Sequence, residues 1–125
     1  MEPLSEEQSD QLVAIVTDLA RQGRTDELLE FFDHGLPVDV QDHEGNTALM
    51  LAAYHGHTGT VRALIGRGAD VDLRNALDQS PVAGALFKGE YAIVGALVDA
   101  GADLDAGTPS ARATAEMFGR TALLG

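Results

Sequence analysis

Residues 45–72 read GNTALMLAAYHGHTGTVRALIGRGADVD, and the pattern returns 33 residues later, over residues 78–105, as DQSPVAGALFKGEYAIVGALVDAGADLD. The two copies align without an insertion or a deletion, so that Leu64 corresponds to Leu97. Self-similarity at a fixed period of this length is typical of proteins that stack small structural units. Each such unit can bury its apolar face only against a neighbour. The sequence therefore predicts a stacked repeat protein rather than a globular enzyme domain.

The first copy carries most of a known pattern, D-x-x-G-x-T-P-L-H-x-A-A-x-x-G-H, which is followed by an apolar helix and G-A-D-V-N. The matching residues are Asp42, Gly45, Thr47, Leu49, Ala52, Ala53, Gly56, His57, Gly68, Ala69, Asp70 and Val71. On these residues the chain resembles the ankyrin-repeat family. The Thr-Pro-Leu-His core of the pattern is replaced by TALM at residues 47–50 and by SPVA at residues 80–83, so its histidine is missing from both copies.

This resemblance implies an all-α fold, an ankyrin-repeat solenoid of about four helix-turn-helix repeats joined by short finger hairpins. It also implies interaction with another protein, and neither catalysis nor a cofactor. The chain as a whole is similar to small stand-alone bacterial ankyrin-repeat proteins, especially those of actinobacteria.

The register of the repeat divides the chain into units of one predicted domain, residues 1–125. We expect an N-terminal cap at about 5–39, full repeats at 40–72 and 73–105, and a truncated C-terminal cap at 106–125. Ser5 and Gln8 have the spacing of a capping box, which predicts a helix start. Further helices are predicted over residues 48–55, 58–67, 81–88 and 91–100.

The period changes after residue 105, because residues 110–120 match residues 80–90 at an offset of 30. Only a stub over residues 120–124 remains for the second helix of the last unit. We expect this stub to leave apolar residues of the preceding helix partly exposed, namely Ile93, Val94, Leu97 and Val98. This end is then either a minimal cap or a contact with a partner or a second copy of the chain.

The composition limits the classes of partner. The chain has 8 basic and 20 acidic residues and a net charge of -12, which argues against nucleic acids and anionic membranes as partners. The acidic residues form either a solvated, solubilising surface or an attraction for a basic partner. There is no cysteine, which excludes a disulfide framework and any thiolate metal site.

The sequence also predicts where the protein acts. No apolar run approaches the roughly 18–20 residues that a membrane helix needs. The N-terminal residues are acidic and lack the basic and apolar regions of a signal peptide. We therefore expect a cytoplasmic protein.

The patterns for catalysis and for metal binding are weak. His55 and His57 flank a turn glycine, but a zinc site needs three or four converging ligands, and no carboxylate stands nearby at ligand spacing. Gly66 and Gly68 stand at the end of a predicted helix rather than at its beginning, and they lack the third glycine of a dinucleotide-binding loop. No serine lies on a strand-to-helix elbow. We expect no enzyme activity, no metal and no cofactor.

The candidates for binding a partner are residues that are not needed for packing between the units. The offsets of 33 and 30 residues place Arg21, Tyr54, Phe87 and Met117 at equivalent positions near the ends of the first helices of successive units. Tyrosine, phenylalanine and methionine are enriched in the centres of interfaces. The alternative is that these side chains fill gaps between neighbouring helices. The full candidate set is Arg21, Gln41, His43, Glu44, Asn46, Tyr54, His55, Arg74, Leu77, Gln79, Phe87, Lys88 and Met117.

Two functional hypotheses follow. The first is a module without activity of its own, which binds another protein on the concave face made by fingertips and first helices. The second is a structural protein that associates with itself through the thin C-terminal cap. We expect a monomer, with a homodimer as the alternative, and the sequence does not identify the partner.

Overall fold

The structure is a computed structural model that describes residues 4–125. The first three residues of the predicted 1–125 domain lie outside the described residues. The elements, in chain order, are α1 (Glu6–Gln22), α2 (Thr25–Asp33), α3 (Ala48–Tyr54), α4 (Thr58–Gly66), α5 (Pro81–Lys88), α6 (Tyr91–Asp99), α7 (Ala111–Met117) and the 3₁₀-helix η1 (Thr121–Leu124). The predicted all-α class is confirmed, since every regular element in the described part of the chain is helical.

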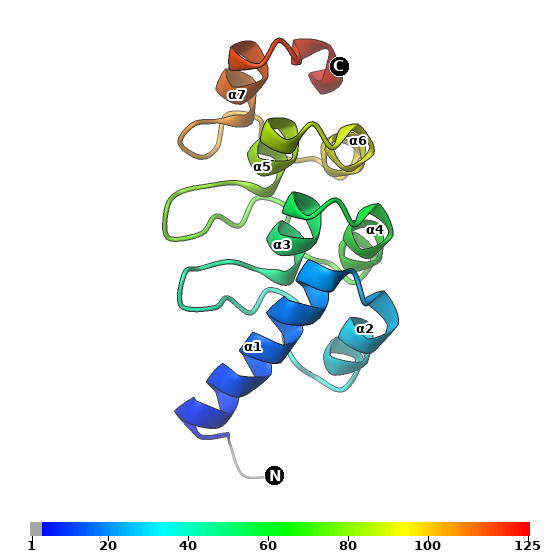
Figure 1. Ribbon diagram of the computed structural model, residues 1–125, viewed down its shortest axis with the longest axis vertical. Helices are drawn as coiled ribbons and strands as arrows, with labels where there is room; N and C mark the ends of the chain where they lie inside the picture. Colours follow the sequence, from blue (N-terminus) through cyan, green and yellow to red (C-terminus); the bar gives the residue numbers. More distant parts are fainter. Residues whose placement is uncertain (1–3) are drawn as a thin grey trace.

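The helices form two parallel rows (Figure 1). One row contains α1, α3, α5 and α7, each packed against the next, and the other contains α2, α4, α6 and η1. Long loops between the units project to one side of the first row, where the finger hairpins were expected. Each of the four predicted units thus holds one helix of each row.

Hydroxyl side chains start the short helices of the first row. The hydroxyl oxygens of Thr47, Ser80 and Ser110 accept hydrogen bonds from backbone N–H groups three residues on, at 3.1, 3.2 and 3.1 Å. These residues are separated by the 33- and 30-residue offsets of the sequence. The predicted capping box of Ser5 and Gln8 is also present at the start of α1. The helices α3, α5 and α7 therefore begin with the same kind of side-chain cap.

The cap at Ser80 is open to a direct test. Ser80→Ala is expected to lower the free energy of unfolding by about 1 kcal/mol, because it leaves the buried N–H of Ala83 without a partner. Ser9→Ala is the matched control, since Ser9 lies inside α1, where alanine favours a helix at least as well as serine. Urea denaturation followed by circular dichroism measures both variants. Equal stabilities for the two would show that the Ser80 cap contributes nothing.

The core lies between the two rows and repeats with the sequence. Leu28, Val61 and Val94 are spaced by 33 residues, and all three are fully buried. In α1 only the second half contributes, since its buried residues are Val16, Thr17, Leu19 and Ala20. The first half of α1 extends beyond the other helices of its row (Figure 1).

The C-terminal end differs from the expectation. Ile93, Val94 and Leu97 of α6 are fully buried, so the prediction that they are partly exposed is wrong; Val98 is partly exposed as expected. The reason is that η1, although only four residues long, packs against both α6 and α7. Its residues Leu123 and Leu124 contact the core.

Arg120 fastens this cap to the preceding unit. Its guanidinium donates hydrogen bonds to the carbonyl oxygens of Leu86 and Phe87, at 2.5 and 3.0 Å. The carbonyl oxygen of Leu86 also accepts from the backbone N–H of Gly89, the C-cap of α5, at 3.1 Å. The last unit is thus linked to the end of α5 by a side chain as well as by the packing of α7 against α5.

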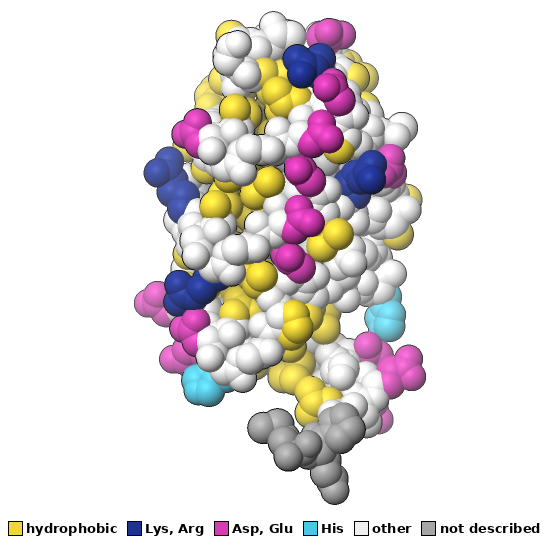
Figure 2. Space-filling view, turned by 180° about the vertical axis from the view of Figure 1, so that it is seen from behind, with side chains coloured by type: hydrophobic (Ala, Val, Ile, Leu, Met, Phe, Trp, Pro, Cys, Tyr) yellow, Lys and Arg dark blue, Asp and Glu magenta, His cyan; other side chains and the backbone are white. Residues whose placement is uncertain are grey.

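A line of acidic side chains runs along the face opposite the view of Figure 1 (Figure 2). Part of the acidity has a structural role in a ladder of hydrogen bonds from backbone N–H groups to aspartate side chains. Each carboxylate except the last accepts at 2.7–2.9 Å from the backbone N–H of the next member, and the members are Asp39, Asp70, Asp72, Asp103 and Asp105. These aspartates link successive units, which explains why the repeat carries Asp at the end of each copy.

Candidate functional site

The first-helix row and the finger loops enclose a groove with a volume of about 690 Å³, which we call the larger groove. Its walls come from α3, α5 and α7 and from the loops before α3 and α5. The sequence-predicted candidates that line it are Arg21, Glu44, Asn46, Tyr54, His55, Gln79, Phe87 and Met117. Most of the predicted set thus converges on one surface.

Apolar side chains in the larger groove are open to solvent. Tyr54, Phe87 and Met117 are 41%, 53% and 68% exposed. The ring of Phe87 meets that of Phe118 edge to face, with centroids 5.4 Å apart. Side chains that only fill gaps between helices would be buried, so these exposures favour the interface alternative over gap filling.

Several residues of the larger groove were not in the predicted set. They include Met50, Asn75, Pro81, Gly84, Pro109, Thr114 and Phe118. Met50 precedes Tyr54 by four residues, and residues at this spacing share one face of a helix. A step of one helical turn back from each predicted position would have found Met50 and its neighbours in the sequence.

A smaller groove of about 290 Å³ continues the surface toward the N-terminal unit. The predicted residues Gln41 and His43 lie here, together with Arg21 and Glu44, which line both grooves. His43 Nε2 lies 3.3 Å from Asp10 Oδ2 of α1. The first finger is thereby held against the first helix.

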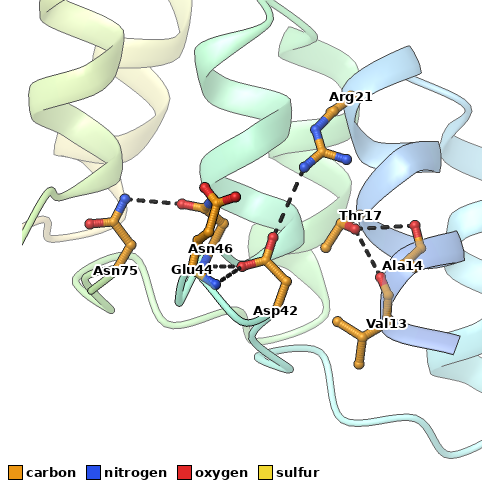
Figure 3. A network of polar contacts seen from close by, with 8 residues as sticks. All are labelled: Val13, Ala14, Thr17, Arg21, Asp42, Glu44, Asn46 and Asn75. Carbon is orange, nitrogen blue, oxygen red and sulfur yellow. Dashed lines mark hydrogen bonds and ion pairs between the residues drawn. The ribbon is translucent and has the colours of Figure 1, made fainter. Parts of the chain in front are cut away.

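A network of polar contacts holds the fingertips in place (Figure 3). Asp42 Oδ1 accepts hydrogen bonds from the backbone N–H groups of Glu44 and Asn46, both at 2.9 Å. Asn75 Nδ2 of the next finger donates to Asn46 Oδ1 at 3.0 Å. Arg21 Nη2 lies 4.0 Å from Asp42 Oδ2, which connects the finger to α1.

Two further hydrogen bonds connect successive fingers through backbone carbonyl oxygens. Gln41 Nε2 donates to the carbonyl oxygen of Arg74 at 3.2 Å, and Ala76 N donates to that of Glu44 at 2.9 Å. The finger side of the grooves is therefore an ordered surface, in which successive fingers support each other.

Three predicted residues line neither groove. Arg74 forms an ion pair with Asp78 at 3.1 Å, and Leu77 is 74% exposed at its fingertip. Lys88 lies at the edge of the larger groove, with Nζ 4.9 Å from the centroid of the Tyr54 ring. Their sequence positions were equivalent to groove positions or close to them, but their side chains take other directions.

Positive charge surrounds His55. Its pKa is lowered from the ordinary value by burial first and then by the charges of Arg21, His57 and Lys88. His57 itself is bound to the backbone of α1, where its Nε2 lies 2.7 Å from the carbonyl oxygen of Arg21. His57 therefore links two units. Among residues 4–125 no group of three metal-ligating side chains comes together.

No helix within residues 4–125 has the length and hydropathy to cross a membrane. The location in the cytoplasm stays a prediction.

The chain is similar to known repeat proteins. A family model described as ankyrin repeats (3 copies) matches residues 17–108, more than half of the chain. An ankyrin repeat protein of Pseudomonas aeruginosa is 51% identical over 45 residues, which cover 36% of this chain and 26% of that protein. The Acyl-CoA-binding domain-containing protein 1 of Arabidopsis thaliana is 37% identical over 62 residues, 48% of this chain and 18% of that protein.

The chain thus spans about a quarter or less of the length of these relatives. A bacterial relative is among them, and the similarity to actinobacterial proteins in particular stays a prediction.

Proposed function

The chain belongs to the ankyrin-repeat family, and on that basis we propose that it is a non-catalytic module that binds a partner protein on the concave face of its fingertips and first helices. Proteins of this family typically bind other proteins and typically lack enzyme activity. Fold alone does not identify a partner, so the proposal rests on the surface.

One observation carries the proposal: the exposed row of Tyr54, Phe87 and Met117 lines one continuous groove. When a partner covers large apolar side chains that are exposed on an ordered surface, the removal of their surface from water stabilises the complex. The hydrogen-bonded fingers beside the row favour binding, because a surface that is already ordered loses little conformational entropy when it binds.

A double substitution tests this proposal. Tyr54→Ala with Phe87→Ala removes the two aromatic anchors, and truncation of such anchors typically costs most of the binding energy of an interface. We expect a partner captured from a lysate of the source organism by the unchanged protein to be lost with the double variant. Quantitative mass spectrometry of the captured proteins measures the difference.

The control for this experiment is Tyr91→Ala. Tyr91 is 61% exposed at the start of α6 and lies outside both grooves, so its removal is expected to leave capture unchanged. Thermal melting by circular dichroism establishes that all variants fold. A folded double variant that captures the same proteins as the unchanged chain would refute the groove as the binding surface.

The alternative of self-association through the C-terminal cap receives no support from the described residues. It depends on exposed apolar residues of α6, but Ile93, Val94 and Leu97 are fully buried and only Val98 is partly exposed. Sedimentation of the purified protein over a range of concentrations tests it separately.

A further inference from the structure

The basic residues of this acidic chain are mostly paired with carboxylates of the chain itself. Four ion pairs have N–O distances of 3.1 Å or less: Arg24–Glu27, Arg67–Asp33, Arg74–Asp78 and Arg112–Asp105. Arg62 on α4 and Arg120, which binds backbone carbonyl oxygens, form no ion pair within residues 4–125, and neither does Lys88 at the end of α5. Arg21 reaches its carboxylate, that of Asp42, only at 4.0 Å.

Two of these cations, Arg21 and Lys88, lie on either side of one histidine. Arg21 is in the last turn of α1 and Lys88 in the last turn of α5, and α3 packs against both helices. His55 directly follows α3, and each charge found to act on its ring is cationic. Arg21 and Lys88 therefore form a cationic edge along the ends of three successive first helices, with the His55 ring between them.

The cationic edge adjoins the apolar surface of the larger groove. The Lys88 ammonium lies 4.9 Å from the ring centroid of Tyr54, and Arg21 and His55 line the groove together with Phe87 and Met117. Glu44 supplies the opposite charge from the finger loop before α3. A bound segment would thus meet cations at the helix ends and apolar side chains beside them.

We propose that the larger groove selects a segment of a partner protein that carries a carboxylate next to large apolar side chains, with the carboxylate bound at the cationic edge. This inference rests on the proposed function and specifies the chemistry of the partner. The apolar side chains would cover Tyr54 and Phe87, and the carboxylate would supply the charge that Lys88 lacks within the chain.

The net charge of -12 does not prevent this recognition. At physiological ionic strength the Debye length is about 8 Å, so exposed charges beyond that distance are largely screened. None of the ladder aspartates lines either groove, whereas Lys88 lies at the edge of the larger one, so Lys88 acts on a bound carboxylate more than the ladder does. A polyanion such as a nucleic acid would extend over the acidic surface, so a short acidic and apolar segment fits the groove better.

A selection from a random peptide library displayed on phage tests the proposal with the full chain as target. We expect the selected peptides to contain aspartate or glutamate beside aromatic or aliphatic residues. Fluorescence polarisation of one labelled selected peptide then measures its Kd. Lys88→Glu is expected to weaken this binding about tenfold or more, and exchange of the peptide's acidic residue for lysine is expected to restore affinity for that variant.

The matched control is Arg62→Glu, which changes the net charge by the same amount. Arg62 is exposed on α4, forms no ion pair in the described part of the chain, and lies outside both grooves. We expect its effect on the Kd to stay below about twofold. Equal losses for the two variants would assign the effect to overall charge and overturn the cationic edge.

The outcomes separate this inference from the proposed function. Selected peptides that need Tyr54 and Phe87 but lack acidic residues, or prefer basic ones, would overturn the carboxylate specificity and leave the groove as the binding surface. Peptides that bind the Tyr54→Ala and Phe87→Ala double variant as well as the unchanged chain would overturn both. A library that yields no groove-dependent peptide also overturns the inference.

Discussion

Leu64→Ala is expected to lower the free energy of unfolding by about 2–5 kcal/mol. Leu64 is fully buried in α4 and belongs to the continuous core between the two rows. Its removal loses the transfer energy of the side chain and leaves a cavity that neighbouring helices fill only in part. Because each unit is supported by its neighbours, a defect in the second unit also weakens the units on either side.

Leu77→Ala is the control, because it makes the same chemical change at a site that is 74% exposed. An exposed substitution of this kind is expected to change the stability by no more than about 0.5 kcal/mol. Urea denaturation followed by circular dichroism gives both values. A loss below about 1 kcal/mol for Leu64→Ala would show that the stack collapses around the missing side chain and that the core is not tightly packed.

Gly45→Ala is expected to destabilise the protein by about 2–5 kcal/mol, as the sum of two costs. The backbone of Gly45 has φ +80°, a left-handed conformation that costs a residue with a Cβ about 1–2 kcal/mol. A Cβ there would also lie 2.7 Å from the backbone nitrogen of Ala76 in the next finger. Overpacking against backbone adds about 1–3 kcal/mol.

Gly68→Ala separates the two costs. Gly68 has a similar φ of +84°, but a Cβ at this position would meet nothing within 4 Å. The control variant should therefore lose only the conformational term of about 1–2 kcal/mol. Both are measured by urea denaturation. If the two variants were equally stable, the fingers would separate at no cost, and the ordered fingertip surface on which the grooves depend would be doubtful.

The sequence identified the repeating elements because the repeat carries its own local signals. Thr47 and Ser80 stand where a helix needs an N-terminal cap, and both cap one. The predicted helix over residues 81–88 agrees with α5, whereas the one over residues 48–55 ends one residue earlier, at Tyr54. Helix ends depend on the hydrogen bonds of the last turn, which local sequence specifies less sharply than the start.

The sequence predicted groove residues where side chains at equivalent positions of successive units lie on the same surface. Tyr54, Phe87 and Met117 line one groove because the offset between units keeps them at the same point of each first helix. The offset did not predict where long charged side chains go. Arg74 turns to Asp78, and Lys88 lies over the Tyr54 ring, since each takes the best partner within its reach.

The sequence by itself determined the stack, its period, its helix starts and the equivalence of Tyr54, Phe87 and Met117 in successive units, because these depend on residues close together in the chain and on their repetition. The tertiary structure decided which surfaces are covered. Ile93 and Leu97 are fully buried in α6, against which the four residues of η1 pack, and Arg120 links this end of the chain to the end of α5. The cationic edge likewise exists only because α1, α3 and α5 end side by side, where charges far apart in sequence act on one another.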